Sequence, residues 1–155
     1  LVAPLRRWPD ARIAICDDDC LYAPGWLAAL DDVARRTTVA CGSAWSVRRL
    51  RRAGKADGHD VAQGFSGVLF PEDTFDGGIF DPPRSAWSVD DVWIAGQLAR
   101  RGRSLCPSPA ARGCVTPKDA PAPLQSTRIA GLDRAQANAA CAKWLHKRYG
   151  IWPPL

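Results

Sequence analysis

The sequence contains no methionine among its 155 residues and only two histidines. No apolar run approaches the roughly 18 residues that a membrane span requires. The first ten residues, LVAPLRRWPD, have no apolar segment after their charges and so do not resemble a secretory signal. These absences favour a cytoplasmic protein without a transmembrane segment, and they leave peripheral membrane contact open. Because the chain opens without methionine just before a predicted strand, we expect it to be a fragment.

The sequence also lacks a C-x-x-C pair, although it contains six cysteines. Isolated cysteines in a protein with no secretory signal are more often reduced, partly buried thiols than zinc ligands or disulfides. We therefore expect free thiols at all six positions, which are Cys16, Cys20, Cys41, Cys106, Cys114 and Cys141.

The bulk composition is that of one ordinary folded domain. With 46% hydrophobic and 24% charged residues, residues 1–155 are enough for a single domain with a real core. The formal net charge is +5, which suits an anionic partner such as a phosphorylated donor, a lipid headgroup or nucleic acid. Residues 48–55 form a basic run without interleaved aromatics, which favours a solvated loop and argues against nucleic-acid binding.

Apolar periodicity and turn residues predict an α/β order of elements. We expect strands over residues 11–16, 38–47, 61–70 and 103–106, the first of them buried on both faces as parallel strands are. Helices are expected from Pro24 to about residue 37, over 90–101 and over 129–149, where His146 should be a satisfied helix residue. A Pro-rich connection, residues 107–128, is expected to be irregular.

Three consecutive aspartates, Asp17 to Asp19, follow the first predicted strand. Successive side chains of an extended segment point to opposite sides, so Asp17 and Asp19 can face one ion while Asp18 turns away. A divalent cation such as Mg²⁺ takes one or two such carboxylates and fills its other positions with diphosphate oxygens and water. A solvated, helix-capping turn explains the triplet equally well.

A second acidic pair, Asp90 and Asp91, opens the predicted helix over residues 90–101. Carboxylates are favoured at a helix N-terminus by the macrodipole, so simple capping is the plainer interpretation. One of the two could also point into a cleft and take a proton from an acceptor hydroxyl as a general base. Gly64 and Gly67, in the predicted strand before this helix, allow close approach of backbone or ligand.

Three segments in this order resemble the glycosyltransferases of the GT-A fold, especially family 2 and related enzymes of polysaccharide synthesis. The resemblance spans residues 13–105, and the three segments read IAICDDDCLYAPGW, QGFSGVLFPEDTFDGGIFD and SVDDVWIAGQLARRG. The last looks like the acidic helix of that family, which ends in Arg-Gly. The resemblance implies a partial GT-A mixed sheet flanked by helices, and metal-dependent, inverting transfer of a sugar from a nucleotide-sugar donor to a hydroxyl of a glycan or lipid-linked acceptor.

By the same resemblance, the aspartate triplet binds Mn²⁺ or Mg²⁺ together with the donor diphosphate, with Asp17 and Asp19 as ligands and Asp18 beside them. Asp91 is the catalytic base, and Asp90 supports it or touches the acceptor. An indole offers a large apolar face to a sugar ring, so Trp87, just before the acidic pair, is a candidate substrate contact together with Gly64 and Gly67.

Two departures from the family leave other functions open. The nucleotide-binding half of such enzymes should precede Leu1. The histidine that many members supply as a further metal ligand has no counterpart in residues 107–124, and His146 lies in the predicted last helix. The sequence therefore predicts only part of a transferase site. A two-metal phosphoesterase would use the same aspartates for hydrolysis, and a non-catalytic remnant or interaction module would use neither cluster.

Overall fold

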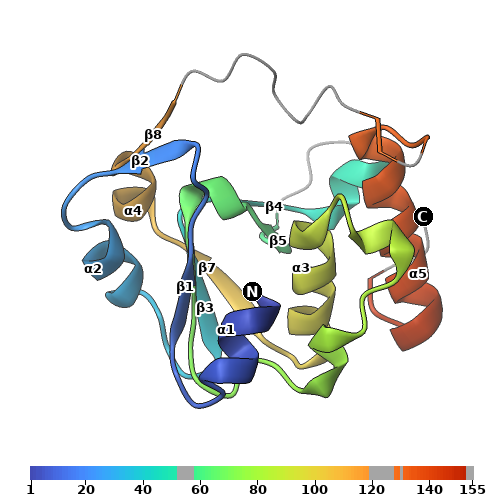
Figure 1. Ribbon diagram of the computed structural model, residues 1–155, viewed down its shortest axis with the longest axis horizontal. Coiled ribbons are helices and arrows are strands. Elements are labelled where there is room, and N and C mark those ends of the chain that lie inside the picture. Colours follow the sequence, from blue (N-terminus) through green and yellow to red (C-terminus); the bar gives the residue numbers. More distant parts are fainter. Residues whose placement is uncertain (52–57, 119–127, 130, 153–155) are drawn as a thin grey trace.

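Four short strands form the central sheet of the computed structural model, which describes residues 1–51, 58–118, 128–129 and 131–152 (Figure 1). Their order is β1, β6, β3, β7. Strand β6 runs antiparallel to both β1 and β3, whereas β3 and β7 are parallel, so the sheet is mixed. The strands are β1 (Ile13–Ile15), β6 (Val68–Phe70), β3 (Thr38–Cys41) and β7 (Ser104–Pro107).

The expectation that the first strand is a buried parallel strand was wrong. Strand β1 pairs antiparallel with β6 and lies at the edge of the described sheet. Only Ile13 is buried, while Ala14 is exposed, as is usual when one side of a strand faces solvent. The apolar run in the sequence is the same for both arrangements, because periodicity over three to five residues does not reveal the pairing partner.

Two small ribbons extend the fold at the end of the sheet where β1 stops. Strand β2 (Cys20–Tyr22) pairs with β8 (Val115–Pro117), and β4 (Ala44–Trp45) pairs with β5 (Val61–Ala62). Strand β2 was not predicted, and it returns the chain immediately after the aspartate triplet. The triplet is therefore a turn between two strands and does not lead directly into a helix.

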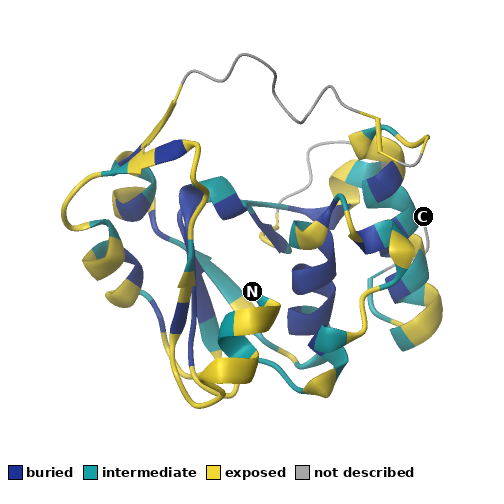
Figure 2. Ribbon diagram, in the orientation of Figure 1, coloured by how far each residue is buried: buried dark blue, intermediate teal, exposed yellow. Residues whose placement is uncertain are grey.

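Helices cover both faces of the sheet (Figure 1). Helices α2 (Trp26–Asp31) and α4 (Pro109–Gly113) pack together on one face, and α3 (Asp90–Arg100) and α5 (Arg134–Tyr149) pack together on the other. Helix α1 (Val2–Arg7) has no buried residue. Figure 2 shows the buried residues gathered in α3 and the central strands. The chain is therefore mixed α/β, with a mixed sheet flanked by helices, which is the coarser part of the predicted fold class.

Among the described residues, the larger of two hydrophobic clusters joins α3 and α5 to the sheet. It includes Val39, Val68 and Phe70 from the strands and Leu98 from α3. Leu145 of α5 rests against Gly96 of α3, where a side chain of any size would collide with it. This close crossing holds α5 on α3, and both helices begin at the same end of the fold. No helix among the described residues is long and apolar enough to cross a membrane.

Several helices and strands begin or end at other residues than predicted, because local turns interrupt them. The helix expected from Pro24 to about residue 37 is the short α2, which is followed by a turn that hydrogen-bonds Arg35 to Thr38. The strand expected over residues 61–70 is broken by a 3₁₀ helix, Gly64–Ser66, followed by Gly67 at φ +87°. The other 3₁₀ helices are Val47–Arg51, Gly77–Phe80 and Arg84–Ala86.

The Pro-rich connection predicted to be irregular contains regular structure in its described part, residues 107–118. Ser108 accepts a hydrogen bond from the Ala111 N–H and caps α4, whose first residue is Pro109. A serine cap followed by proline is a standard helix start, and it explains why this segment is ordered. Residues 119–127 lie outside the described part, as do residues 52–55 of the basic segment 48–55.

The last helix begins at Arg134, five residues later than expected. Asp133 and Gln136 form a reciprocal capping box, each side chain accepting a hydrogen bond from the backbone N–H of the other residue. The box fixes the helix start. Within α5, His146 Nδ1 lies 2.6 Å from the Trp152 carbonyl oxygen, so it is a satisfied helix residue as expected. The structure contains all six cysteines as free thiols.

Candidate functional site

A cavity of about 590 Å³ lies at the end of the sheet where β1 stops and α3 begins. It brings together seven of the eight residues that the sequence singled out, although they come from three separate segments. The predicted residues that line the cavity are Asp17, Asp18, Asp19, Gly64, Trp87, Asp90 and Asp91. The other lining residues are Ile15, Cys16, Ser88, Ile129, Leu132 and Arg134.

Asp17 to Asp19 form a turn, here called the aspartate turn, whose backbone is held by hydrogen bonds from Tyr22 on one side and Lys118 on the other. The Asp17 N–H donates to the Tyr22 hydroxyl at 2.9 Å, and that hydroxyl donates to the Phe65 carbonyl at 3.0 Å. Lys118 donates from its Nζ to the Asp18 carbonyl at 2.7 Å and from its N–H to the Asp19 carbonyl at 2.8 Å. These bonds use main-chain atoms of the turn and do not occupy its carboxylates, of which Asp19 Oδ1 accepts a hydrogen bond from the Cys20 thiol at 3.7 Å.

Gly64 lies between the two acidic clusters. Its N–H donates to Asp91 Oδ1 at 3.3 Å. A methyl group at this glycine would sit 3.3 Å from Asp17 Oδ1 and 3.3 Å from Asp91 Oδ1, so twice that distance bounds the gap between the two oxygens. The missing side chain keeps this gap open, in keeping with the predicted close approach at Gly64.

Burial, and after it the negative charge of Asp90, raise the pKa of Asp91 to about 7. Arg134 acts in the opposite direction, with its guanidinium 3.9 Å from Asp91 Oδ2. A carboxyl group of this kind exchanges its proton near neutral pH, which is the property that a general base requires.

Asp17 is also harder to ionise than an isolated aspartate. Burial raises its pKa, and the charges of Asp19 and Asp90 raise it further. Among the described residues that line the cavity there are five carboxylates and one arginine, Arg134. The cavity therefore carries an excess of negative charge that the protein itself does not neutralise.

The described residues contain no group of three or more His, Cys, Asp or Glu side chains arranged to hold a metal ion. A complete protein cage is not needed for Mg²⁺ or Mn²⁺, which commonly bind through one or two carboxylates and draw their other ligands from phosphate oxygens and water. Carboxylate oxygens are the right donor type, and their mutual repulsion at Asp17 would be relieved by a cation. The donor set fits such an ion bound together with a phosphate ligand.

Gly67 does not line the cavity, and its predicted contact with substrate is not supported. It has φ +87°, and a side chain there would collide with the indole of Trp26. That indole also donates from Nε1 to the Ser66 carbonyl at 3.2 Å. Gly67 therefore serves the packing of Trp26 against the chain that carries Gly64.

Sequence reasoning missed three residues that shape the site, namely Tyr22, Lys118 and Arg134. The first two act on the backbone of the aspartate turn, and no motif marks such contacts in a sequence. Arg134 had a usable signal: the D-x-x-Q pattern at Asp133 and Gln136 marks a capping box and hence a helix start. It did not reveal which carboxylate the arginine faces.

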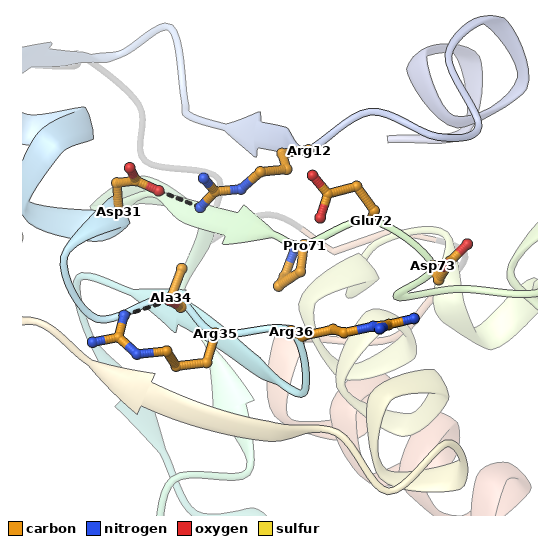
Figure 3. Close-up of a pocket in the computed structure, with 8 residues that line it drawn as sticks. All are labelled: Arg12, Asp31, Ala34, Arg35, Arg36, Pro71, Glu72 and Asp73. Atoms are coloured by element: carbon orange, nitrogen blue, oxygen red, sulfur yellow. Dashed lines mark hydrogen bonds and ion pairs between the residues drawn. The ribbon is translucent and has the colours of Figure 1, made fainter.

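A second cavity of about 580 Å³ lies at the opposite end of the sheet (Figure 3). It contains none of the predicted residues. Its described lining has three arginines and three carboxylates, and Arg12 is ion-paired with Asp31 across it. The charges of this second cavity balance, whereas the first cavity has an excess of negative charge. We therefore take the first cavity as the candidate functional site.

Comparison of the chain with protein-family models, with curated proteins and with solved structures gives no match. The functional assignment therefore depends on the geometry and electrostatics of the site together with the sequence resemblance.

Proposed function

We propose that this chain is the metal-binding and acceptor-side part of a GT-A type glycosyltransferase, which moves a sugar from a nucleotide-sugar donor to a hydroxyl acceptor with inversion. The observation that carries the proposal is the meeting of Asp17 and Asp91 on either side of Gly64 in one cavity. The two carboxylates come from segments far apart in the sequence, so helix capping alone does not account for their meeting.

Asp91 is the general base of the proposed reaction. The acceptor oxygen forms a bond to the anomeric carbon while its proton passes to Asp91. The bond between that carbon and the diphosphate oxygen breaks, and the nucleoside diphosphate leaves with the electron pair. A pKa of about 7 supports this role, because the group is then ionised in a substantial fraction of molecules at neutral pH and still basic enough to accept a proton.

Two neighbours tune this base in opposite directions. Asp90 disfavours the ionised form of Asp91 and makes it a stronger base, whereas Arg134 favours the ionised form and keeps it available. The hydrogen bond from the Gly64 N–H orients Oδ1. Asp91 is thus oriented by the backbone and leaves Oδ2 on the side of Arg134.

Asp17 and Asp19 are the proposed ligands of Mn²⁺ or Mg²⁺, with Asp18 in the same turn. When bound, the cation supplies charge neutralisation for the departing diphosphate. The cavity without a cation would repel a diphosphate, because five carboxylates face one arginine. Cation and nucleotide should therefore bind together.

A two-metal phosphoesterase is less well supported. Such sites usually draw on further His and Asp ligands. Neither His59 nor His146 lines the cavity, and the latter is engaged with the Trp152 carbonyl. The environment of Asp91 disfavours its ionised form, and a non-catalytic module has no use for such a carboxyl group. This environment therefore favours a catalytic site.

The test is calorimetric titration of the chain with UDP, GDP and ADP, each with and without Mn²⁺. We expect at least one nucleotide to bind only when Mn²⁺ is present, because the cation neutralises the carboxylates that otherwise repel the diphosphate. Asp17→Asn should weaken this binding by at least about tenfold, since it removes a charged ligand of the ion.

The matched control is Asp31→Asn, an exposed aspartate of the second cavity, which should leave nucleotide binding unchanged. Absence of Mn²⁺-coupled binding for all three nucleotides would refute the donor-binding part of the proposal. Hydrolysis of a phosphodiester by the same preparation, again without nucleotide binding, would favour the phosphoesterase.

A further inference from the structure

Three exposed apolar side chains form the rim of the acidic cavity. Trp87 is 80% exposed, Ile129 is 45% exposed and Leu132 is 36% exposed. Trp87 follows the 3₁₀ helix before α3, and the other two precede α5. Large hydrophobic side chains rarely gather at the mouth of a charged pocket unless a ligand covers them. We call these three residues the apolar rim.

Two residues of the apolar rim, Ile129 and Leu132, are joined by backbone hydrogen bonds. The Ile129 N–H donates to the Leu132 carbonyl at 3.0 Å, and the Leu132 N–H donates to the Ile129 carbonyl at 3.1 Å. Gly131, at φ +81°, provides the left-handed conformation that closes this turn. The capping box at Asp133 follows directly, so the turn is continuous with α5. These bonds fix the backbone that carries Ile129 and Leu132 relative to the start of α5.

The acidic residues of the cavity restrict the charge of a ligand that contacts the apolar rim. Asp90 and Asp91 lie in the same cavity as the rim, with Arg134 as the one described cation in its lining. A negatively charged group placed next to these carboxylates would be repelled. A plain polyol can stack on an indole, but the aliphatic Ile129 and Leu132 offer its hydroxyls no hydrogen-bond partner.

We propose that the acceptor is an uncharged amphipathic alcohol, whose reacting hydroxyl lies at Asp91 and whose alkyl or aryl portion lies on the apolar rim. This inference rests on the proposed function and narrows its acceptor class. Alkyl glycosides and the uncharged sugar headgroups of glycolipids share this chemistry.

The experiment compares n-octyl β-D-glucopyranoside, below its micelle-forming concentration, with methyl β-D-glucopyranoside in calorimetric titrations of the chain. The two probes differ only in alkyl length. Burial of two of the additional methylene groups, at about 0.8 kcal/mol each, already corresponds to more than a tenfold difference in affinity. We therefore expect the octyl glucoside to bind at least about tenfold more tightly.

Leu132→Ser and Ile129→Ser should each reduce this ratio by at least about threefold, with circular dichroism used to check that the variants fold. Leu27→Ser is the matched control, because Leu27 is 50% exposed and does not line this cavity. Asp91→Asn should keep the preference for the octyl probe, since the apolar rim is intact.

Equal binding of the two probes, or an equal effect of Leu27→Ser, would overturn the inference. If Mn²⁺-coupled nucleotide binding is present and the alkyl preference absent, the acceptor class is wrong and the transferase proposal stands. If the alkyl preference is present and nucleotide binding absent, the transferase proposal and the acceptor role assigned to the rim both fail.

Discussion

Replacing Asp91 with asparagine should stabilise the fold, and the gain should depend on pH. In the folded chain, burial first and then the charge of Asp90 raise the pKa of Asp91 from 3.8 to about 7. The folded protein therefore holds this proton more tightly than the unfolded chain does. Wild-type stability is lost at about 1.4 kcal/mol per pH unit as pH rises from about 4 to about 7, and the loss is complete above that range.

The full loss is about 4 kcal/mol for a shift of this size. The Asp91 side chain is 21% exposed, so solvent screens it only in part. Asparagine resembles the protonated carboxyl and can still accept the hydrogen bond from the Gly64 N–H. We expect Asp91→Asn to gain between about 2 and 4 kcal/mol at pH 8 and much less at pH 5.

Urea unfolding of both proteins at pH 5, 6, 7 and 8, in buffer containing EDTA, measures this difference. With an m-value between about 1 and 3 kcal/mol per molar, the midpoint at pH 8 should rise by about 0.7 M or more. A difference that does not change between pH 5 and pH 8 would refute the buried environment assigned to Asp91. A loss of stability at pH 8 would do the same, because it would mean that Arg134 outweighs burial.

Three further substitutions test the surroundings of the site. Asp90→Asn should lower the pKa of Asp91, because it removes a neighbouring negative charge. The pH profile of transfer, or the NMR titration of the Asp91 carboxyl, should move to lower pH. A shift to higher pH would contradict the effect assigned to Asp90. Gly67→Ala should cost about 2 kcal/mol or more in urea unfolding, because its left-handed φ and its contact with Trp26 both oppose a side chain. Gly131→Ala, also left-handed but with open space around it, should cost only about 1 kcal/mol, and equal costs would rule out the packing role of Gly67. Tyr22→Phe removes the hydroxyl between the Asp17 N–H and the Phe65 carbonyl and should lower the free energy of unfolding by about 1–2 kcal/mol. Amide hydrogen exchange at Asp17 should become faster, because its N–H loses its acceptor. Unchanged exchange would argue against a role of the Tyr22 hydroxyl in holding the aspartate turn.

The sequence predicted the mixed α/β class and the residues of the acidic cavity better than it predicted the sheet. Asp17 and Asp91 carry clear chemical signals, since carboxylates after an apolar strand and at a helix start are visible in one dimension. The antiparallel pairing of β1 with β6 is not visible, because three residues of each strand are too few to show a pattern specific to the partner. The expectation of a parallel strand failed for that reason.

The start of α5 shows a different kind of failure. Residues 129–132 have good helix composition apart from Gly131, and they were predicted to be part of the last helix. The structure instead pairs Ile129 with Leu132 through backbone hydrogen bonds, and both residues line the cavity. The capping box at Asp133 could have corrected the boundary. Nothing in the sequence places Ile129 and Leu132 in the same cavity as Trp87, because that arrangement depends on how α5 packs on α3.

The register between β1 and β6 sets the position of the aspartate turn relative to Gly64. Ile15 faces Val68, which sets how far the chain runs on one side to Asp17 and on the other back to Gly64. A slip of one residue would shift the aspartate turn by about 3.3 Å against Gly64 and turn the buried Ile13 toward the opposite face. The distance between the two acidic clusters is thus linked to burial of Ile13, an isoleucine that touches neither of them, so substitutions in this strand can be expected to affect activity and stability together.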